Sequence, residues 1–131
     1  MRNIRFCVEL SGFLFLVGCA AMGVFATSNP DVKLSDAEYL YMNKGRPLPA
    51  ERLIFEAIEI YQKQNDSQGL GHAYRAYGDL LRSPIVATKY DKIYREYGFR
   101  DKTVTFENRV AKSKEYYTKS LEYYQAAETP L

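Results

Sequence analysis

Apolar side chains at helical spacing run through most of this chain. Between Ala50 and Tyr61, apolar or small residues recur every three or four positions, which is the period of an amphipathic helix. Two later segments share this spacing, and their apolar stripes consist of Leu70, Tyr74, Tyr77 and Leu81 and of Val110, Tyr117, Leu121 and Tyr124. No segment alternates polar and apolar residues as a half-buried strand does. The pattern therefore predicts an all-α fold.

Capping and turn residues indicate where the helices begin and end. Residues 35–38, Ser-Asp-Ala-Glu, have the form of a capping box, so a first helix is expected from there to about Lys44, before Gly45. Pro49 suits the first position of a second helix that ends near Asp66. Further helices are expected at residues 68–82, 89–97 and 105–127.

Composition excludes several classes of function. With 18 Lys and Arg against 16 Asp and Glu, the net charge of +2 is too small to indicate a nucleic-acid partner. His72 is the only histidine, so a histidine-rich metal site is excluded, and no motif for a cofactor or a nucleophile is present. The chain has 12 Tyr and no Trp, so Tyr is expected to replace part of the usual aliphatic core.

The N-terminal segment has the order of a signal peptide. Two positive charges in the first five residues precede an apolar run that ends in Leu16-Val17-Gly18-Cys19. These four residues resemble the lipoprotein box of bacteria. The resemblance implies that residues 1–18 are removed, that Cys19 carries a membrane-anchoring lipid, and that the protein lies in the cell envelope. Because Ala20 and not an acidic residue follows Cys19, the resemblance also implies that the protein is anchored at the periplasmic face of the outer membrane.

This interpretation divides the chain into three parts. After the signal peptide, residues 19–30 are expected to form a flexible tether, and residues 31–131 the helical domain. Two alternatives remain for the N-terminal segment. Residues 10–26 could be a short uncleaved anchor, or an ordinary signal peptidase could cut after Ala26.

The helices, taken in pairs, resemble tetratricopeptide repeats, which are helix-turn-helix units of 34 residues. Gly45 matches the turn glycine of the first pair, and Gly78 matches the close-packing glycine of the second pair. The other matching positions are Ala50, Ile54 and Ala57 in the first pair and Ser113, Tyr117, Ser120 and Leu121 in the second. The resemblance implies helix pairs that stack as a short solenoid.

The second pair departs from the repeat because it holds an insertion at about residues 83–105. Two units are also fewer than the three that a solenoid usually needs. We therefore expect either that the insertion acts as a cap or that a partner protein completes the stack. The insertion contains an aromatic stripe that consists of Tyr90, Tyr94, Tyr97 and Phe99. We expect this stripe to lie in the core, and any exposed part of it to be an interaction patch.

The resemblance also implies a partner-binding groove lined by the first helix of each pair. The first pair is expected to contribute Tyr39 and Asn43, together with Val32, Ser35 and Met42. The second pair is expected to contribute His72, Arg75, Asp79 and Arg82. Two arginines suit an acidic segment or a C-terminal carboxylate of a protein or peptide partner. The alternative is a solvated polar face on which Asp79 pairs with Arg75 or Arg82.

These features favour a non-enzymatic, membrane-tethered adaptor of an envelope assembly for secretion, pili or wall processing. A second hypothesis is a structural or immunity-like lipoprotein that binds through residues 85–104. A third is a small hydrolase dependent on His72, which nothing else in the sequence supports.

Overall fold

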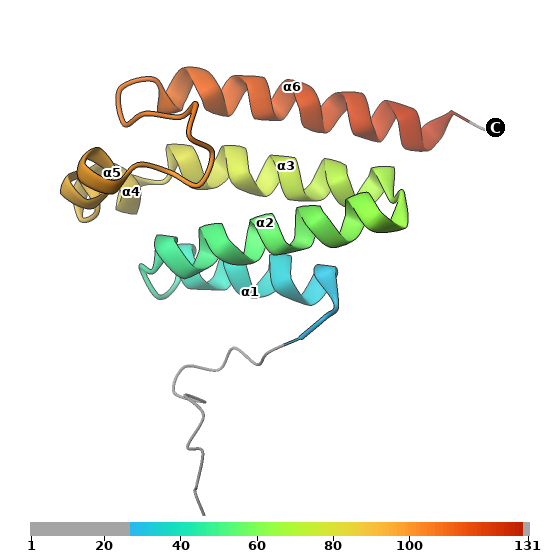
Figure 1. Cartoon of the computed structure of the whole chain (residues 1–131), viewed down its shortest axis with the longest axis horizontal. Helices are drawn as coiled ribbons and strands as arrows, with labels where there is room; N and C mark the ends of the chain where they lie inside the picture. Colours follow the sequence, from blue (N-terminus) through green and yellow to red (C-terminus); the bar gives the residue numbers. More distant parts are fainter. Residues whose placement is uncertain (1–26, 130–131) are drawn as a thin grey trace, which may run out of the picture.

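The computed structural model describes residues 27–129, which form an all-helical fold without strands (Figure 1). Four long helices lie side by side in a stack, and two short helices lie together at one end of it. The elements are α1 (Pro30–Met42), α2 (Pro47–Gln64), α3 (Ser67–Arg82), α4 (Pro84–Thr88), α5 (Asp91–Tyr97) and α6 (Arg109–Glu128). The prediction of an all-α fold is therefore confirmed for this part of the chain.

The first helix begins earlier than the capping-box prediction placed it. Asn29 caps α1, because its side-chain Oδ1 accepts the backbone N–H of Asp31 at 2.9 Å, and Pro30 fills the first helical position. Ser35 lies in the helix interior, so the prediction of a start at residue 35 is wrong. Asn29 and buried Pro30, at the end of the expected tether, belong to the folded part.

The turn between α1 and α2 is built on Gly45. This residue has a left-handed φ of +60°, which glycine adopts without a steric penalty. Helix α2 then begins at Pro47 and not at Pro49, because Pro47 occupies the first helical position. The second helix ends at Gln64, and the third covers Ser67–Arg82, as the spacing predicts to within a residue or two.

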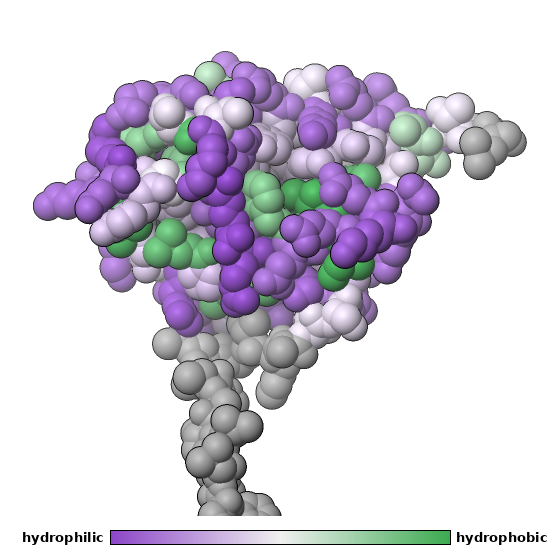
Figure 2. Space-filling view, viewed as in Figure 1, coloured by the Kyte–Doolittle hydropathy of each residue, from purple (hydrophilic) through white to green (hydrophobic). Residues whose placement is uncertain are grey.

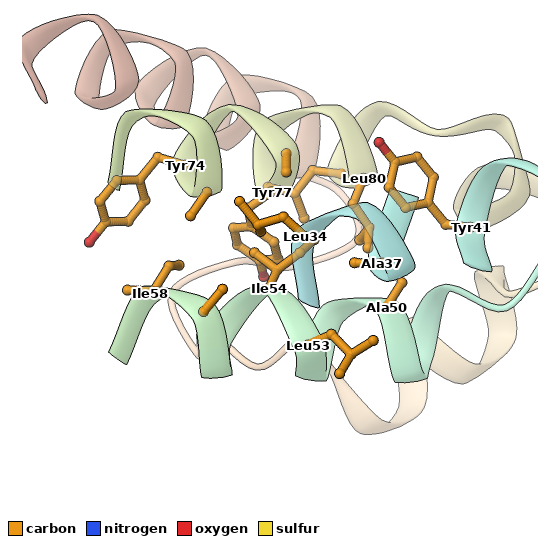
Figure 3. Packing of buried hydrophobic residues seen from close by; sticks show 14 of the residues in the cluster. Leu34, Ala37, Tyr41, Ala50, Leu53, Ile54, Ile58, Tyr74, Tyr77 and Leu80 are labelled. Atoms are coloured by element: carbon orange, nitrogen blue, oxygen red, sulfur yellow. The ribbon is translucent and has the colours of Figure 1, made fainter. Parts of the chain in front are cut away.

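The first helix pair packs through aliphatic and small side chains. Ala50, Ile54 and Ala57 of α2 have no exposed surface. They face Leu34, Ala37 and other buried residues of α1 (Figure 3). The tyrosine core is confirmed as well, because Tyr61 and Tyr77 are among the largest fully buried side chains.

Glycine and serine bring α3 and α6 close together. A Cβ atom on Gly78 would lie 2.6 Å from the ring of Tyr117, and one on Gly71 would lie 2.7 Å from the ring of Tyr124. Ser120 is buried and donates its hydroxyl to the Gly71 carbonyl at 2.7 Å. The predicted role of Gly78 in close packing is confirmed, and Tyr takes the space that its missing side chain leaves.

The last helix differs from its predicted extent and face. Thr105 and Asn108 cap each other's backbone N–H groups, and α6 starts only at Arg109. Val110 and Leu121 are 43% and 61% exposed, so the prediction that they lie on the packed face is wrong. The buried residues of α6 are Ser113 and Ser120, and Tyr117 and Tyr124 of the predicted stripe do lie against α3, where their hydroxyls bond to Asp79 and His72.

The insertion folds into two short helices and a loop, where one helix over residues 89–97 was expected. Gly98 ends α5 as predicted, with a φ of +74°. The insertion and the adjoining turn have their own buried residues, which are Val86, Tyr94, Phe99, Val104 and Phe106. The rings of Tyr94 and Phe99 stack with centroids 4.2 Å apart. The insertion is therefore an integral part of the core.

Glu51 of α2 joins this insertion to the helix stack. Its carboxylate is 3% exposed and accepts the Tyr77 hydroxyl at 2.9 Å and the backbone N–H of Arg100 at 2.7 Å. Burial raises the pKa of Glu51 above its ordinary value, while the two hydrogen bonds act in the opposite direction.

Candidate binding groove along helix α3

A polar stripe lies along one face of α3, at the edge of its contact with α6. It consists of His72, Arg75, Asp79 and Arg82, of which only Asp79 is partly buried. These four positions share one helix face because they are three or four residues apart. The structure also places hollows beside both ends of the stripe, with α1 as one wall.

The larger hollow lies at the C-terminal end of α3. It is a cavity of about 660 Å³ between α1, α3, α4 and α6. Its lining combines apolar surface with the polar groups of Asp79 and Arg82, and includes Tyr41, Met42, Gly45, Pro84, Ile85 and Tyr117. A volume of this size holds one or two amino-acid side chains or a small organic molecule.

Tyr117 of α6 fixes the acidic group of this cavity. Its hydroxyl donates to Asp79 Oδ1 at 2.7 Å, and burial and the neighbouring carboxylate raise the pKa of Tyr117 to about 12. Arg82 also contacts the Tyr117 hydroxyl and lowers its pKa in part. No ion pair within residues 27–129 joins Asp79 to Arg75 or Arg82, whereas His72, Arg75 and Arg82 are exposed as on a solvated polar face.

Tyr41 stands between these charges and is the residue that sequence reasoning did not single out. Burial raises the pKa of its hydroxyl, with further contributions from Asp79 and Glu38, whereas Arg75 opposes them. The side chain is 7% exposed and reaches from α1 toward the C-terminal end of α3 (Figure 3). Its spacing from Leu34 and Ala37 could have identified it as a core residue, but not as part of the groove.

The smaller hollow lies at the N-terminal end of α3. It measures about 260 Å³ and includes His72 and Arg75 of α3 and Ser35 and Glu38 of α1. The Tyr61 hydroxyl donates to Asp31 at its edge. His72 Nδ1 lies 2.8 Å from the Tyr124 hydroxyl, so each of the two groove tyrosines of α6 bonds to a residue of the α3 stripe.

The structure does not bring all six predicted groove residues together. Asp79 and Arg82 line the larger cavity, and His72 and Arg75 line the smaller one. Tyr39 and Asn43 are exposed and line neither of these two hollows. Tyr39 is 42% exposed, and the Lys44 ammonium lies 5.4 Å from its ring centre.

The insertion carries a separate hollow of about 420 Å³. Beside it, the ring of Phe106 lies between two guanidinium groups, with Arg95 at 3.9 Å and Arg109 at 4.1 Å from the ring centre. The predicted aromatic stripe divides, because Tyr94 and Phe99 are buried whereas Tyr97 is 69% exposed. Tyr97 is therefore the part of the stripe that a partner could reach.

Nothing in the described range forms a metal centre, since no three His, Cys, Asp or Glu side chains there are placed to hold an ion. None of the six helices is both long and apolar enough to span a membrane. The predicted lipid site, Cys19, and the signal peptide lie outside the described residues.

Comparisons of this chain with protein-family models, curated proteins and solved structures give no match. The class that the structure defines is a small all-helical protein with a polar groove along α3.

Proposed function

We propose that this protein is a non-enzymatic adaptor that binds a partner peptide in the groove along α3 and is held at a membrane by a lipid on Cys19. The expected occupant presents an apolar side chain next to a carboxylate, either from an acidic residue or from a C-terminus. The observation that carries the proposal is the cavity of about 660 Å³, which combines an apolar lining with Arg82.

The charges of the groove suit such an occupant. Arg75 and Arg82 lie on one face of α3 about 10 Å apart, given the helical rise of 1.5 Å per residue, and both side chains are exposed. A guanidinium binds a carboxylate through two parallel hydrogen bonds. Asp79 is less available to a cationic ligand, because the Tyr117 hydroxyl already donates to it.

The helix arrangement is compatible with tetratricopeptide-like pairing. The α1–α2 and α3–α6 hairpins would be the two units, with α1 and α3 as the groove helices and α4–α5 as the insertion. Under this proposal two units suffice, because the insertion adds buried residues of its own to the stack.

The groove is tested with synthetic peptides that end in a leucine with a free carboxylate, against the same peptides with an amidated C-terminus. Fluorescence anisotropy of the labelled peptides reports binding. We expect Arg82→Glu and Arg75→Glu each to weaken binding about tenfold or more, since each reverses the charge that meets the carboxylate. Lys92→Glu makes the same charge change on the exposed side of α5 and should leave binding unchanged.

Circular dichroism melting of each variant checks that the fold persists. Equal binding by Arg82→Glu and the unsubstituted chain would overturn the groove proposal. Membrane tethering is tested separately by mass spectrometry of the mature N-terminus, with Cys19→Ser as the control. A chain that starts at Thr27, or one that keeps Met1, would contradict lipidation.

A second candidate is binding through the insertion, as a structural or immunity-like lipoprotein would do. The exposed ring of Tyr97 beside the hollow of about 420 Å³ favours this surface. Deleting residues 85–104 is a poor test, because buried Tyr94 and Phe99 would be lost with it. Tyr97→Ser removes a side chain that is 69% exposed, so a partner lost with this variant but kept by Arg82→Glu would identify the insertion.

A further inference from the structure

Two hydroxyl groups in the wall of the larger α3 cavity have no partner in the fold. Tyr41 and Ser83 both line this cavity, and they are only 7% and 8% exposed. Ser83 directly precedes α4, where a serine hydroxyl usually caps the helix, but its side chain forms no capping bond. Neither hydroxyl bonds to another group among residues 27–129. Polar side-chain atoms as buried as these usually have a partner.

Both hydroxyls open to the cavity. In the described part of the chain, the unpartnered side-chain atoms that are sealed from solvent are the Tyr94 hydroxyl and Arg109 Nε. The hydroxyls of Tyr41 and Ser83 are not among them, so each keeps some accessible surface, and the cavity is the open space that both residues line. Burial raises the pKa of Tyr41, so its hydroxyl keeps its proton and can donate.

Asp79 and Arg82 supply the charged part of the same wall. The Tyr117 hydroxyl donates to Asp79 Oδ1 at 2.7 Å and contacts Arg82, so it positions both side chains. Within the described range the second oxygen of Asp79 accepts no hydrogen bond, and the Arg82 guanidinium forms no ion pair. The cavity therefore offers three donor groups, which are the guanidinium and the two hydroxyls, and one open carboxylate oxygen as an acceptor.

We propose that this cavity selects the C-terminal residue of a partner peptide, in which an apolar side chain, a backbone N–H and a free carboxylate share one Cα atom. Arg82 and the hydroxyls of Tyr41 and Ser83 bind the carboxylate, and Asp79 accepts the N–H. The apolar wall that holds the side chain includes Met42, Pro84 and Ile85. This inference rests on the proposed groove function and decides between its two sources of a carboxylate.

The donors and the acceptor of the cavity match this residue better than other ligands. A carboxylate accepts about four hydrogen bonds and suits three donor groups, whereas one amide N–H suits one acceptor. An ammonium group brings three N–H donors, more than one open oxygen can accept. A phosphate would be repelled by the partly buried carboxylate of Asp79. An acidic residue inside a chain lacks the apolar group on the same Cα atom.

The apolar wall distinguishes the cavity from ordinary surface. On the face that Figure 2 shows, hydrophilic residues predominate and the apolar residues form separate patches between them. The cavity measures about 660 Å³, against about 260 Å³ for the hollow at the N-terminal end of α3. A concave site of this kind, with a few polar groups in an apolar lining, is typical of ligand recognition.

Three labelled peptides test the inference by fluorescence anisotropy with the full chain in detergent micelles. The first ends in a leucine with a free carboxylate. The second is its ester analogue, in which an oxygen replaces the N–H of that leucine. The third has an internal aspartate beside a leucine and an amidated C-terminus. We expect the second and third to bind about tenfold more weakly or worse, because each lacks one of the groups that the cavity pairs.

Tyr41→Phe and Ser83→Ala each remove one hydroxyl from the wall. Each variant should bind the first peptide about tenfold more weakly, because it loses a hydrogen bond to a charged group. Thermal unfolding followed by circular dichroism should be unchanged, since neither hydroxyl has a partner within residues 27–129. Tyr123→Phe is the matched control, because Tyr123 does not line the cavity, and it should bind normally.

The outcomes separate this inference from the groove function on which it rests. If the third peptide binds as tightly as the first and loses binding with Arg82→Glu, the groove stands and the inference is overturned. Normal binding by both Tyr41→Phe and Ser83→Ala would also overturn it. So would free leucine that binds as tightly as the first peptide, because its ammonium would then occupy the site. If no peptide binds, the groove and the inference are both wrong.

Discussion

Between α1 and α2 the buried contact consists mainly of alanines and aliphatic side chains, with the Lys33–Glu56 ion pair and the Tyr61–Asp31 hydrogen bond beside it, whereas between α3 and α6 it consists of glycines, serines and tyrosines. Ile54 and Ala57 in the first pair have no polar side-chain atom. In the second pair Tyr117, Tyr124 and Ser120 all form hydrogen bonds across the contact. Both contacts include polar pairs, but only in the second do the tyrosine hydroxyls bond to residues of the α3 stripe.

This difference has a consequence for the groove. Each groove tyrosine of α6 crosses a glycine of α3 and bonds to the residue that follows that glycine. Tyr117 crosses Gly78 and reaches Asp79, and Tyr124 crosses Gly71 and reaches His72. A contact built in this way orients the groove side chains as it holds the helices together. An aliphatic contact could not do so.

The largest expected effect is in the aliphatic contact. Ile54→Ala should lower the free energy of unfolding by about 2–5 kcal/mol, because it removes a fully buried side chain and leaves a cavity. Urea denaturation followed by circular dichroism measures the change. Leu121→Ala, which shortens a side chain that is 61% exposed, is the control and should change stability little. Equal losses for the two variants would contradict the burial pattern.

A smaller loss is expected from Gly78→Ala in the α3–α6 contact. The new Cβ would lie 2.6 Å from the Tyr117 ring, and overpacking of this kind costs about 1–3 kcal/mol. The higher helix propensity of alanine offsets about 1 kcal/mol of that cost. In a Tyr117→Leu background the ring is absent, and the same substitution should cost less, although the Ser113 carbonyl oxygen still lies 3.2 Å from the new Cβ. An undiminished loss in that background would show that Tyr117 is not the obstacle.

Removing one hydroxyl from the tyrosine contact should have a still smaller effect. Tyr117→Phe deletes the hydrogen bond to Asp79 and should cost about 0.5–1.5 kcal/mol in the free energy of unfolding. Tyr123→Phe is the matched control, because the structure gives the Tyr123 hydroxyl no hydrogen-bond partner. If the two variants are equally stable in urea denaturation, the Tyr117 bond does not stabilise the fold.

The most gradual effect is expected in the pH dependence at Glu51, which links the aliphatic helix α2 to Tyr77 of α3. Burial raises the pKa of Glu51 in the folded state above its ordinary value of 4.5, so folding favours the protonated form. The contribution of Glu51 is therefore fully present below pH 4.5 and decreases as the pH rises through the raised pKa.

Glu51→Gln removes this titration and keeps an oxygen that can accept from Tyr77 and Arg100. As the pH rises above 4.5, the free energy of unfolding of Glu51→Gln should therefore increase relative to that of the unsubstituted chain. Subtraction is needed because the pKa values of Asp101 and Glu56 are lowered and act in the opposite direction. A constant difference from pH 4 to 8 would contradict a titrating Glu51.

The sequence predicts a helix and its buried face correctly where a single periodic pattern determines both. The stripe of Leu70, Tyr74, Tyr77 and Leu81 is buried as predicted, with 5% exposure or less. Prediction was wrong where two local signals competed. Residues 35–38 and the Asn29-Pro30 pair both have the form of a helix start, and the preference of proline for the first helical position favoured the earlier one.

The candidate site was predictable only in part. The α3 stripe follows from periodicity, because all four residues lie on one helix. The chemistry around it comes from residues distant in the chain, such as Tyr117 bonded to Asp79 across 38 positions. Tyr39 and Asn43 were expected in the same groove but line neither hollow of α3, because the residues that α1 presents there depend on how the helices pack, which no local pattern encodes.

By itself, the sequence determined the all-helical class, the positions of the turns at Gly45 and Gly98, and the polar stripe of α3. These depend on backbone preference and on spacing within one segment. Only the tertiary structure decided which face of α6 is buried, that Glu51 anchors the insertion, and that Tyr41 lies among the groove charges. Those outcomes depend on which helices meet, because burial and hydrogen bonding between distant residues are properties of the assembled core.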